Sequence, residues 1–380
     1  MAEKKNNHKG SLIRRFSRRL VMLVNLAVAA VFLLACLQPW LSPETFWFIG
    51  YLGIAFPYLL LVLLGFLLFW LFTRHKWYAL VPLVTIAIGY RQIGALFSLR
   101  YHPFSIEKKD GDLRVMTWNI MGFSGFEPGV KNRERNADRI FTLMDEYNPD
   151  VICLQEYGQF EDGRLGRSYL ELMRKKGYVH EVLSRDYSRV TYSYSSGLAI
   201  FSRYPIVATK RLPFTSSAES MLYADIMVGS DTVRVFTTHL QSYRFSEEER
   251  AQIEKVKEKE RPAFNPVASV LRKMKRAFRN RGAQVDQAVP LVDESPYPQI
   301  VCLDMNDVPG SYAYWKLRGD RKDVFLEKGF GIGRTYIAFA PTLRIDHIFC
   351  HPSFSVAQMA VVQRRYSDHL PLVADLRLQK

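Results

Sequence analysis

Residues Gln299–Pro309 read QIVCLDMNDVP, a short apolar run that is followed at once by Asp304, Asn306 and Asp307. A continuous apolar run of this length predicts a β-strand that is buried on both faces. Polar residues directly after such a strand lie at the rim of its sheet, where they form a turn, part of a site, or both. The same pattern recurs four more times downstream of residue 110, and this recurrence favours a site.

Other apolar runs also end in an acid, an amide or an imidazole. Three are LRVMTWN (113–119), VICLQE (151–156) and VRVFTTH (233–239), while LRIDHIFC (343–350) and SDHLPLVADLRL (367–378) carry such residues within or before the strand. Taken singly, each polar residue has an ordinary explanation, such as a loop cap, a turn or a satisfied core histidine. Because strand ends that converge on one rim form a shared pocket, the set together predicts a functional site. Its members are Asn119, Glu156, His239, Asp304, Asn306, Asp346, Asp368 and His369.

Helices alternate with these strands. Asn132–Tyr147 has apolar residues at helical spacing, and Ser168–Gly177 is a second predicted helix. Gly197–Phe201 and Met221–Val228 add further strands. Strands with intervening helices and hairpins predict one layered α/β domain over residues 101–380, with mixed rather than purely parallel pairing.

A charged helical insertion is expected within this domain at residues 245–292. Arg250–Arg261 alternates in charge sign, as a solvated helix does. Ala268–Arg281 carries six Lys and Arg residues, with apolar residues at helical spacing. The second segment is either a helix packed on the domain with a solvated basic face, or a helix that attracts anionic lipid headgroups or a polyanionic substrate.

Two long apolar runs near the N-terminus predict transmembrane helices. Leu20–Leu37 is interrupted only by Asn25, and Phe46–Phe72 has no charged residue across 27 positions. The second is long enough to cross about 30 Å of hydrocarbon even when tilted. The first lacks the short apolar core and small-residue cleavage site of a signal peptide. The basic residues that precede it predict a cytoplasmic tail at residues 1–19.

A third run, Tyr78–Leu99, is interrupted by Arg91 and Gln92. It either crosses the membrane, because apolar neighbours offset a cost of roughly 2.5–3.5 kcal/mol for a central Arg, or forms a short interfacial segment. In the first case the membrane region, residues 20–100, holds three transmembrane helices, and the domain at 101–380 lies on the extracytoplasmic side of a bacterial inner membrane. In the second case the domain is cytoplasmic. We expect the first.

The net charge of +15 is unevenly distributed. Residues 1–100 hold 11 Lys and Arg against 2 Asp and Glu, which leaves 41 against 35 for residues 101–380. Most of the excess belongs to the membrane region, so the charge of the domain gives little support to a nucleic-acid-binding protein. The four cysteines show no CxxC or Cys/His spacing, which argues against a zinc site.

The residue types of the predicted site restrict its chemistry. The chain has no Walker-type Gly-rich loop, no GxSxG motif and no HExxH motif. Carboxylates and amides are the ligands of hard cations such as Mg²⁺ and Mn²⁺. With imidazoles beside them, they predict metal-assisted hydrolysis of a phosphate ester.

In chain order, the segments TWN, CLQE, TTHL, LDMND, RIDHI and SDHLP, together with GLAIFSRYP at 197–205, resemble the endonuclease/exonuclease/phosphatase superfamily. The resemblance covers about residues 112–378. It implies an α/β (α+β) four-layered sandwich, in which two packed mixed β-sheets are flanked by helices and the site lies at one edge. The apolar N-terminal segments lie outside it.

For the metal, the resemblance implies that Glu156 holds a divalent cation, Mg²⁺ or Mn²⁺, with Asn119 beside it and Asp368 joining the metal shell. Some members carry an acidic residue two positions after the TWN segment, where this chain has Met121. The number of metals, one or two, therefore stays open. His347 is left out of the site, because strand alternation points it away from its neighbour.

For the reaction, the resemblance implies that Asp304 orients or deprotonates the attacking water and that Asn306 holds a nonbridging phosphate oxygen. Asp346 would fix the tautomer and orientation of His369, which contacts the phosphate. His239 would be a second imidazole near the phosphate or the leaving group. An in-line displacement at phosphorus needs such charge neutralisation and a positioned nucleophile.

The sequence thus favours a membrane-anchored, divalent-metal-dependent phosphoesterase that hydrolyses a phosphate mono- or diester on a phospholipid headgroup or another phosphorylated small molecule. The alternative is a Mg²⁺-dependent nuclease on DNA or RNA, which the modest charge of the domain disfavours. A catalytically dead membrane binding protein is disfavoured by the completeness of the acid, amide and imidazole set. Specificity is expected in the loops 121–135, 157–168, 184–196 and 308–338.

Overall fold

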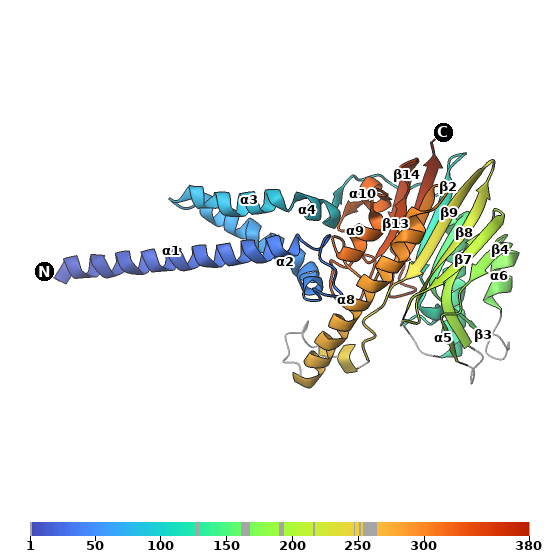
Figure 1. Ribbon diagram of the computed structural model, residues 1–380, viewed down its shortest axis with the longest axis horizontal. Helices are drawn as coiled ribbons and strands as arrows, with labels where there is room; N and C mark the ends of the chain where they lie inside the picture. The colour runs from blue at the N-terminus through green and yellow to red at the C-terminus, as the bar shows by residue number, and fades with distance from the viewer. Residues whose placement is uncertain are drawn as a thin grey trace.

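The computed structural model describes residues 2–126, 129–160, 168–189, 194–215, 217–246, 248–250, 252–253 and 264–379. A helical arm at the N-terminus leads into a domain built on β-sheets, and the C-terminus lies in that domain (Figure 1). The described helices are α1 (Ala2–Ala35), α2 (Ile49–Leu71), η1 (Lys76–Ala79), α3 (Leu80–Ile88), α4 (Tyr90–Leu96), η2 (Met121–Phe123), α5 (Val130–Tyr147), α6 (Tyr169–Lys175), α8 (Phe264–Asp293), α9 (Tyr312–Arg318) and α10 (Val324–Lys328).

The strands are β1 (Ser98–Leu99), β2 (Leu113–Asn119), β3 (Val151–Phe160), β4 (His180–Leu183), β5 (Tyr187–Arg189), β6 (Tyr194–Ser202), β7 (Ile206–Pro213), β8 (Ser220–Val228), β9 (Asp231–His239), β10 (Gln299–Asp304), β11 (Lys322–Asp323), β12 (Phe330–Gly331), β13 (Asp346–Cys350), β14 (Phe354–Val361) and β15 (Leu372–Leu378). One large sheet has the order β11-β13-β10-β9-β8-β7, and the other has the order β14-β15-β2-β3-β6-β4, with β5 paired to β6. Within these described strands, β9 with β10 and β2 with β3 are parallel, while β10 with β13 and β2 with β15 are antiparallel. The mixed pairing predicted from the sequence is therefore confirmed.

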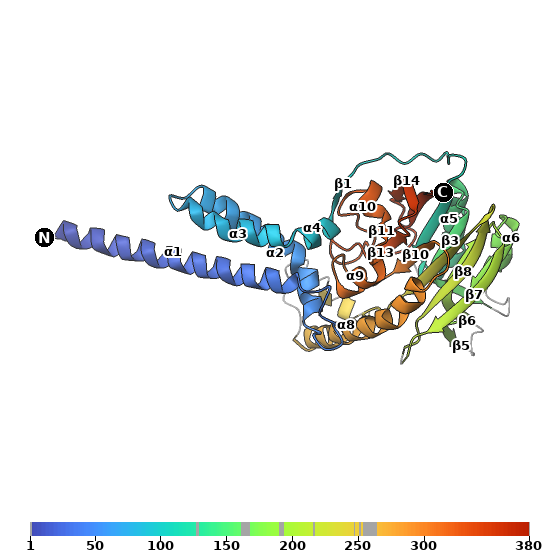
Figure 2. The same ribbon diagram turned by 45° about the horizontal axis from the view of Figure 1, so that its top comes forward.

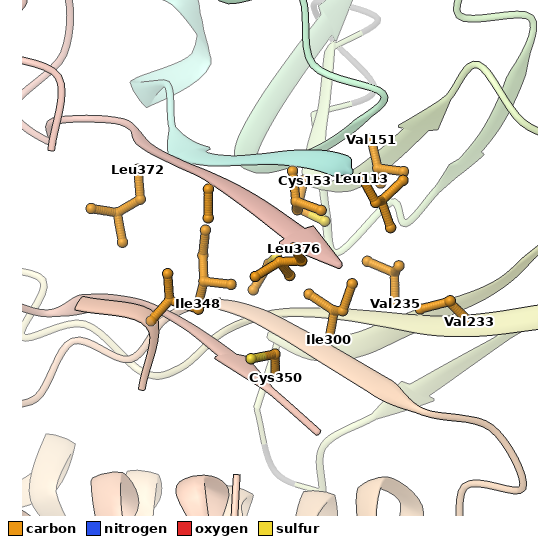
Figure 3. Close-up of a cluster of buried hydrophobic side chains, with 14 of the residues drawn as sticks. Leu113, Val151, Cys153, Val233, Val235, Ile300, Ile348, Cys350, Leu372 and Leu376 are labelled. Atoms are coloured by element: carbon orange, nitrogen blue, oxygen red, sulfur yellow. The ribbon is translucent and has the colours of Figure 1, made fainter. Parts of the chain in front are cut away.

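The main core lies between the two sheets. Strand β10 shows how the sequence builds it, because successive side chains of a strand point to opposite faces. Ile300 and Cys302 face the opposite sheet, where they meet Val115 and Cys153, and all four side chains are fully buried. Figure 3 shows side chains of this cluster gathered between strands of the two sheets.

Helices cover the outer faces of both sheets. Val301 and Leu303, on the other face of β10, pack against α8 and α9 in a cluster that includes Val285 and Leu317. On the second sheet, Trp118 and its neighbours pack against α5 and α6. The result is helices, sheet, sheet and helices, so the four-layered sandwich implied by the resemblance is confirmed.

The N-terminal arm contains two helical segments, Arg14–Ala35 and Ile49–Leu71, that are long and apolar enough to cross a membrane. The expected third segment is broken: Lys76–Ile88 and Tyr90–Leu96 meet at an angle of 64°, and they count as a third span only if the bent pair is one span.

The polar interruption of this third segment lies against the sheet domain. The guanidinium of Arg91 lies 5.1 Å from the ring centroid of Trp315. The Trp315 indole donates a hydrogen bond of 2.9 Å to the side-chain oxygen of Gln92. These two residues, which the sequence places inside an apolar run, therefore have partners on the domain.

The charged insertion forms one long helix in its described part. Helix α8 runs from Phe264 to Asp293, and it packs on the domain through buried residues that include Phe278 and Arg281. Arg272, Arg276 and Arg279 are exposed on the other side. The packed helix with a basic outer face, one of the two alternatives drawn from the sequence, is thus present. Of the predicted helix at 250–261, residues 251 and 254–261 lie outside the described residues.

Candidate active site

The strand registers bring most of the predicted residues to one edge of the sandwich. Asp304 pairs with His239 on the parallel strand β9 and with Asp346 on the antiparallel strand β13, so the three lie abreast in one sheet. In the other sheet, Asn119 at the end of β2 pairs with Gln155 on β3. These pairings depend on contacts between segments that are far apart in the sequence.

Asn119 joins the two sheets at this edge. Its side-chain nitrogen donates to Oε1 of Glu156 at 3.1 Å and to Oδ2 of Asp304 at 2.9 Å. Its oxygen accepts the backbone N–H of Met121 at 3.1 Å. The amide therefore holds two carboxylates from different sheets side by side.

The sequence predicted Glu156 at the end of a strand, but it lies inside β3, which continues to Phe160. The register of β3 against β6 shifts between Leu154 and Tyr157, and Glu156 has φ 51°. A bulge of this kind re-aims a side chain, and a positive φ is costly for a non-glycine residue. The neighbouring Gln155 is fully buried and bonds to Thr117 and Thr237, whereas 41% of the Glu156 side chain is exposed.

His369 and Asp346 form a buried hydrogen-bonded pair. Nδ1 of His369 lies 2.9 Å from Oδ2 of Asp346, and its Nε2 lies 3.6 Å from Oδ2 of Asp304. Burial by itself would lower the pKa of His369, but the charges of Asp346 and Asp304 outweigh it and raise that pKa well above its ordinary value. The imidazole therefore carries its proton at neutral pH in this arrangement.

Asn306 follows Asp304 in a tight turn. Its backbone N–H donates to Oδ1 of Asp304 at 2.9 Å, its φ is 52°, and its side chain donates to the carbonyl of Leu240 at 3.0 Å. The turn expected for this segment is thus present, next to the other predicted site residues. The next residue, Asp307, pairs with the fully buried Arg281 of α8 at 3.1 Å.

The two remaining predicted residues lie close by. Nε2 of His239 is 3.6 Å from Oδ2 of Asp304 and 3.8 Å from Oε1 of Glu156. Asp368 is half-buried, and its charge is among the causes of the raised pKa of His369. His347, which the sequence excluded from the site, is buried beside Asp323 instead, at 3.7 Å.

The charge balance of this edge fits a divalent cation. No Lys or Arg among the described residues forms an ion pair with Glu156, Asp304, Asp346 or Asp368. The ligand atoms of Asp304, Asp346 and His369 lie within 4.8 Å of one another. Protonated His369 offsets only part of the negative charge of these four acids, and carboxylates are the donor set of Mg²⁺ and Mn²⁺.

A pocket with a cavity volume of about 110 Å³ adjoins these residues. Of the loops in which specificity was expected, only 308–338 contributes to its described lining, through Val308 and Tyr336. Apart from the predicted site residues, the rest of the lining comes from segments that the sequence did not indicate, mainly Ser242–Phe245 and Phe339–Ile345. Four of the seven described non-glycine residues with positive φ line this pocket, namely Glu156, Arg244, Asn306 and Phe339. Such strain cannot be read from the sequence, but its concentration here is typical of functional sites.

The missed lining is largely aromatic and basic. Tyr243 and Phe245 stack at 5.2 Å, and Phe339 lies 5.8 Å from Phe245 in an edge-to-face contact. Tyr336 lies 4.8 Å from the ring of His369. The segment QSYRF, directly after the TTHL segment, was the one available signal, since two aromatic residues and an Arg follow a predicted site strand there.

Two packed mixed sheets with acids, an amide and imidazoles at one edge define a hydrolase of phosphate ester bonds. A model of the Endonuclease/Exonuclease/phosphatase family matches residues 116–369, and the chain belongs to this family. Members of the family are phosphoesterases and nucleases that generally depend on a divalent metal, so the protein is a hydrolase acting on phosphate esters. A second model, a domain of unknown function (DUF8431), matches residues 18–96.

Individual relatives are distant. Tyrosyl-DNA phosphodiesterase 2 of Xenopus tropicalis is 22% identical over 167 residues, which is 43% of this chain and 40% of that protein. The chain thus spans less than half the length of this curated relative. Among solved structures, an endonuclease/exonuclease/phosphatase from Beutenbergia cavernae has a TM-score of 0.51 at 24% identity, covering 70% of this chain and 72% of its own. The human Nocturnin catalytic domain has a TM-score of 0.51 at 18% identity, covering 71% and 95%. At these identities the structures support the fold alone.

Proposed function

We propose that the protein is a membrane-anchored, divalent-metal-dependent phosphoesterase that hydrolyses a phosphate ester in the headgroup of a membrane lipid. The observation that carries this proposal is a continuous series of aromatic contacts from the pocket to the start of α2. Phe245 and Tyr243 of the pocket lead to Phe278 of α8, whose ring lies 5.9 Å from Tyr243 and 5.0 Å from Tyr51. Tyr51 in turn lies 6.1 Å from Trp47.

This aromatic series ends where a membrane-spanning segment begins. Helix α2 starts at Ile49, and Trp and Tyr residues are favoured at the interface between headgroups and hydrocarbon. A phosphate ester bound at Asp304 and His369 would therefore lie beside aromatic residues that are packed, ring by ring, onto the start of α2. An aromatic lining near the bilayer surface suits a substrate with acyl chains better than a small hydrophilic one.

The two ends of the N-terminal helical arm support an orientation of the chain in the membrane. We propose residues 1–19 as a cytoplasmic tail, 20–100 as the membrane region and 101–380 as the catalytic domain. Arg18 contacts His75, which places the basic end of α1 beside the Arg74–Lys76 loop. The sheet domain lies at the opposite end of the arm (Figure 2). With the bent third segment as a crossing, the positive-inside rule places the catalytic domain outside the cytoplasm.

The proposed cation site centres on Glu156, because 41% of its side chain is exposed and, among the described residues, only Asn119 donates a hydrogen bond to it. The atoms of His369 and Asp346 are already engaged with each other. Asn119, Glu156 and Asp368 would hold Mg²⁺ or Mn²⁺ once the amide turned its oxygen towards the ion. A bound cation would neutralise charge on the phosphate oxygens.

In the proposed reaction the chain's own groups position the water and bind the phosphate. Asp304 orients or deprotonates the attacking water, because its carboxylate lies beside both imidazoles at 3.6 Å. Protonated His369, held by Asp346, binds a phosphate oxygen, and Asn306 binds another. His239 lies near the phosphate or the leaving group. These groups neutralise the charge that develops on the phosphate in the transition state.

A nuclease is the second candidate function, because the curated relative named above acts, by its name, on a tyrosyl–DNA phosphodiester. The balance of 41 basic against 35 acidic residues in 101–380 does not favour it.

The deciding experiment uses the full chain in detergent–phospholipid micelles. Three substrates are tested separately, namely mixed phospholipid, bis-p-nitrophenyl phosphate and supercoiled plasmid, each with Mg²⁺, Mn²⁺ or EDTA. Metal-dependent release of the lipid headgroup supports the proposal. Plasmid nicking without lipid turnover would replace it with an anchored nuclease.

Glu156→Gln is expected to weaken Mn²⁺ binding by at least tenfold, because it removes a carboxylate that we propose as the principal ligand. Isothermal titration calorimetry of the full chain without substrate measures this directly. Glu171→Gln, a change of the same type at an exposed position of α6, is the control and should bind Mn²⁺ like the unmodified protein. Equal affinities in all three proteins would remove Glu156 from the metal site.

Phe245→Ala is expected to reduce kcat/KM for a short-chain phospholipid by about tenfold relative to the same headgroup without acyl chains. Loss of an aromatic contact worth about 1.4 kcal/mol corresponds to that factor. Phe330→Ala, at a 62% exposed aromatic residue outside the pocket, is the matched control. If both substrates lose activity equally, the aromatic lining of the pocket does not bind acyl chains.

A further inference from the structure

A second cavity lies along the outer face of α8, apart from the catalytic pocket. Its volume is about 570 Å³, and the helix contributes residues at one-turn spacing to its wall. The cations among these residues are Arg272, Lys275, Arg276 and Arg279. Thr215 and Ser217 also line it, and Glu44 is the one acid in the described lining. The groove is therefore strongly basic.

These four cations have no carboxylate partner among the described residues. Arg279 donates to the backbone carbonyl of Glu44 at 3.0 Å, and Arg272 donates to the carbonyl of Ala268 in its own helix at 3.4 Å. Lys275 lies 4.1 Å from the ring centroid of Trp47, and no hydrogen bond or ion pair within the described part of the chain involves the side chain of Arg276. Like charges at one-turn spacing destabilise a helix. An anion in the groove would relieve this repulsion.

The groove lies at the level where α2 begins. Glu44 and Trp47 precede α2 directly, and Tyr51 in its first turn donates to the carbonyl of Leu271 on α8. The ring of Phe278 packs on Gly50, so closely that a Cβ built there would lie 2.5 Å from it. A helix fixed in this way to the first residues of a membrane span holds its cations at the depth of the lipid headgroups.

The catalytic pocket is on the other side of the same helix. Phe278 and the buried Arg281 face Tyr243 and Asp307, whereas Arg272, Arg276 and Arg279 are exposed. None of the groove residues lines the catalytic pocket. A ligand of the groove therefore does not compete for Asp304 or His369.

We infer that the groove of α8 binds the phosphate headgroup of an anionic phospholipid as a second, non-catalytic lipid site. This inference rests on the part of the proposed function that inserts α2 in a bilayer. The occupant is a lipid rather than a free anion, because Glu44 of the groove lies five residues before α2 and Lys275 of the groove packs on Trp47, so the membrane itself would present a headgroup there. The site would keep the catalytic domain bound to an anionic membrane surface in one orientation.

The test measures binding in an Asp304→Asn background, so that turnover plays no part. The full chain in neutral detergent micelles is titrated by calorimetry with dihexanoyl phosphatidylglycerol, dihexanoyl phosphatidylcholine and inorganic phosphate. We expect the phosphatidylglycerol affinity to fall at least tenfold when Arg272→Gln, Arg276→Gln and Arg279→Gln are combined, since each cation near an anionic lipid contributes. Phosphatidylcholine affinity should be lower and unchanged by the triple substitution.

The control combines Lys175→Gln, Lys210→Gln and Arg364→Gln, which remove the same charge from exposed positions outside the groove and should leave phosphatidylglycerol affinity unchanged. Arg276→Gln alone should weaken binding severalfold, and within the described part of the chain it breaks no side-chain hydrogen bond or ion pair. Equal phosphatidylglycerol affinity in the groove and control triples would overturn the inference. Equally tight, groove-dependent binding of inorganic phosphate would reassign the groove to a free anion. Absence of lipid turnover by the unmodified chain would instead contradict the proposed function and leave this binding result standing.

Discussion

Asp304→Asn is expected to lower kcat for phosphate ester hydrolysis by about a thousandfold, within the range for loss of a general base. The change keeps the shape of the side chain and removes the charge that lies 3.6 Å from the imidazoles of His239 and His369. An amide there cannot accept the proton of the attacking water. Because the amide can still accept the backbone N–H of Asn306, the variant should be folded.

The measurement is kcat at saturating Mg²⁺ and substrate, with the melting temperature recorded in the same preparation. Asp320→Asn, the same substitution at an exposed acid outside the pocket, controls for the change of charge and should retain full activity. If Asp304→Asn retained more than a tenth of the activity, Asp304 could not be the group that activates water.

Much of this site could be predicted because apolar runs show where strands end. Asp304 and Asn119 lie at the ends of β10 and β2, as their sequence context indicated. Asp346 instead opens its strand, and His369 precedes β15 in a loop. They still reach the same edge, because antiparallel pairing brings the start of one strand beside the end of another.

The direction of the Glu156 side chain could not be predicted from the sequence pattern. Strict alternation leaves open whether Gln155 or Glu156 faces outward, and only the bulge against β6 decides it. The pocket lining could not be predicted for a similar reason, since Phe245 and Phe339 come from separate loops that only the fold brings together. Loop conformation depends on such distant contacts and has no readable periodicity.

The partners in buried ion pairs likewise cannot be predicted from residues that are neighbours in the sequence. Within the segment RIDHI, the nearest basic residues to Asp346 in the sequence are Arg344 and His347. In the structure, Asp346 pairs with His369, and Arg344 donates to Asp323 at 2.7 Å. Both partners are set by packing between segments, so only the three-dimensional arrangement identifies the residues on which the stability of this edge depends.

Arg344→Met is accordingly expected to destabilise the domain by about 3–5 kcal/mol, the usual cost of leaving one charge of a buried pair unpaired. Arg344 and Asp323 are both almost fully buried, and Arg344 also donates to the carbonyl of Ala95 at 2.6 Å. Burial by itself would raise the pKa of Asp323, but the Arg344 guanidinium outweighs it and holds that pKa well below its usual range. For a domain of this size the loss corresponds to a fall of about 10 °C in melting temperature.

The pH dependence identifies the cause of this loss. Because the pKa of Asp323 is depressed in the folded protein, the ion pair contributes its full stability above the ordinary aspartate pKa of about 4 and loses it as the pH falls further. In Arg344→Met the lone carboxylate is unfavourable only while it is charged. The stability deficit of the variant should therefore be largest at neutral pH and shrink under acidic conditions.

A double variant separates charge from packing. Adding Asp323→Asn to Arg344→Met removes the unpaired charge, so it should recover more than half of the lost melting temperature at pH 7, while Arg364→Met at an exposed position should change it by less than about 2 °C. A deficit that was equal at pH 7 and pH 4, and unaffected by Asp323→Asn, would mean that Arg344 stabilises the fold through its contacts with Ala95 and Phe325 rather than through its charge.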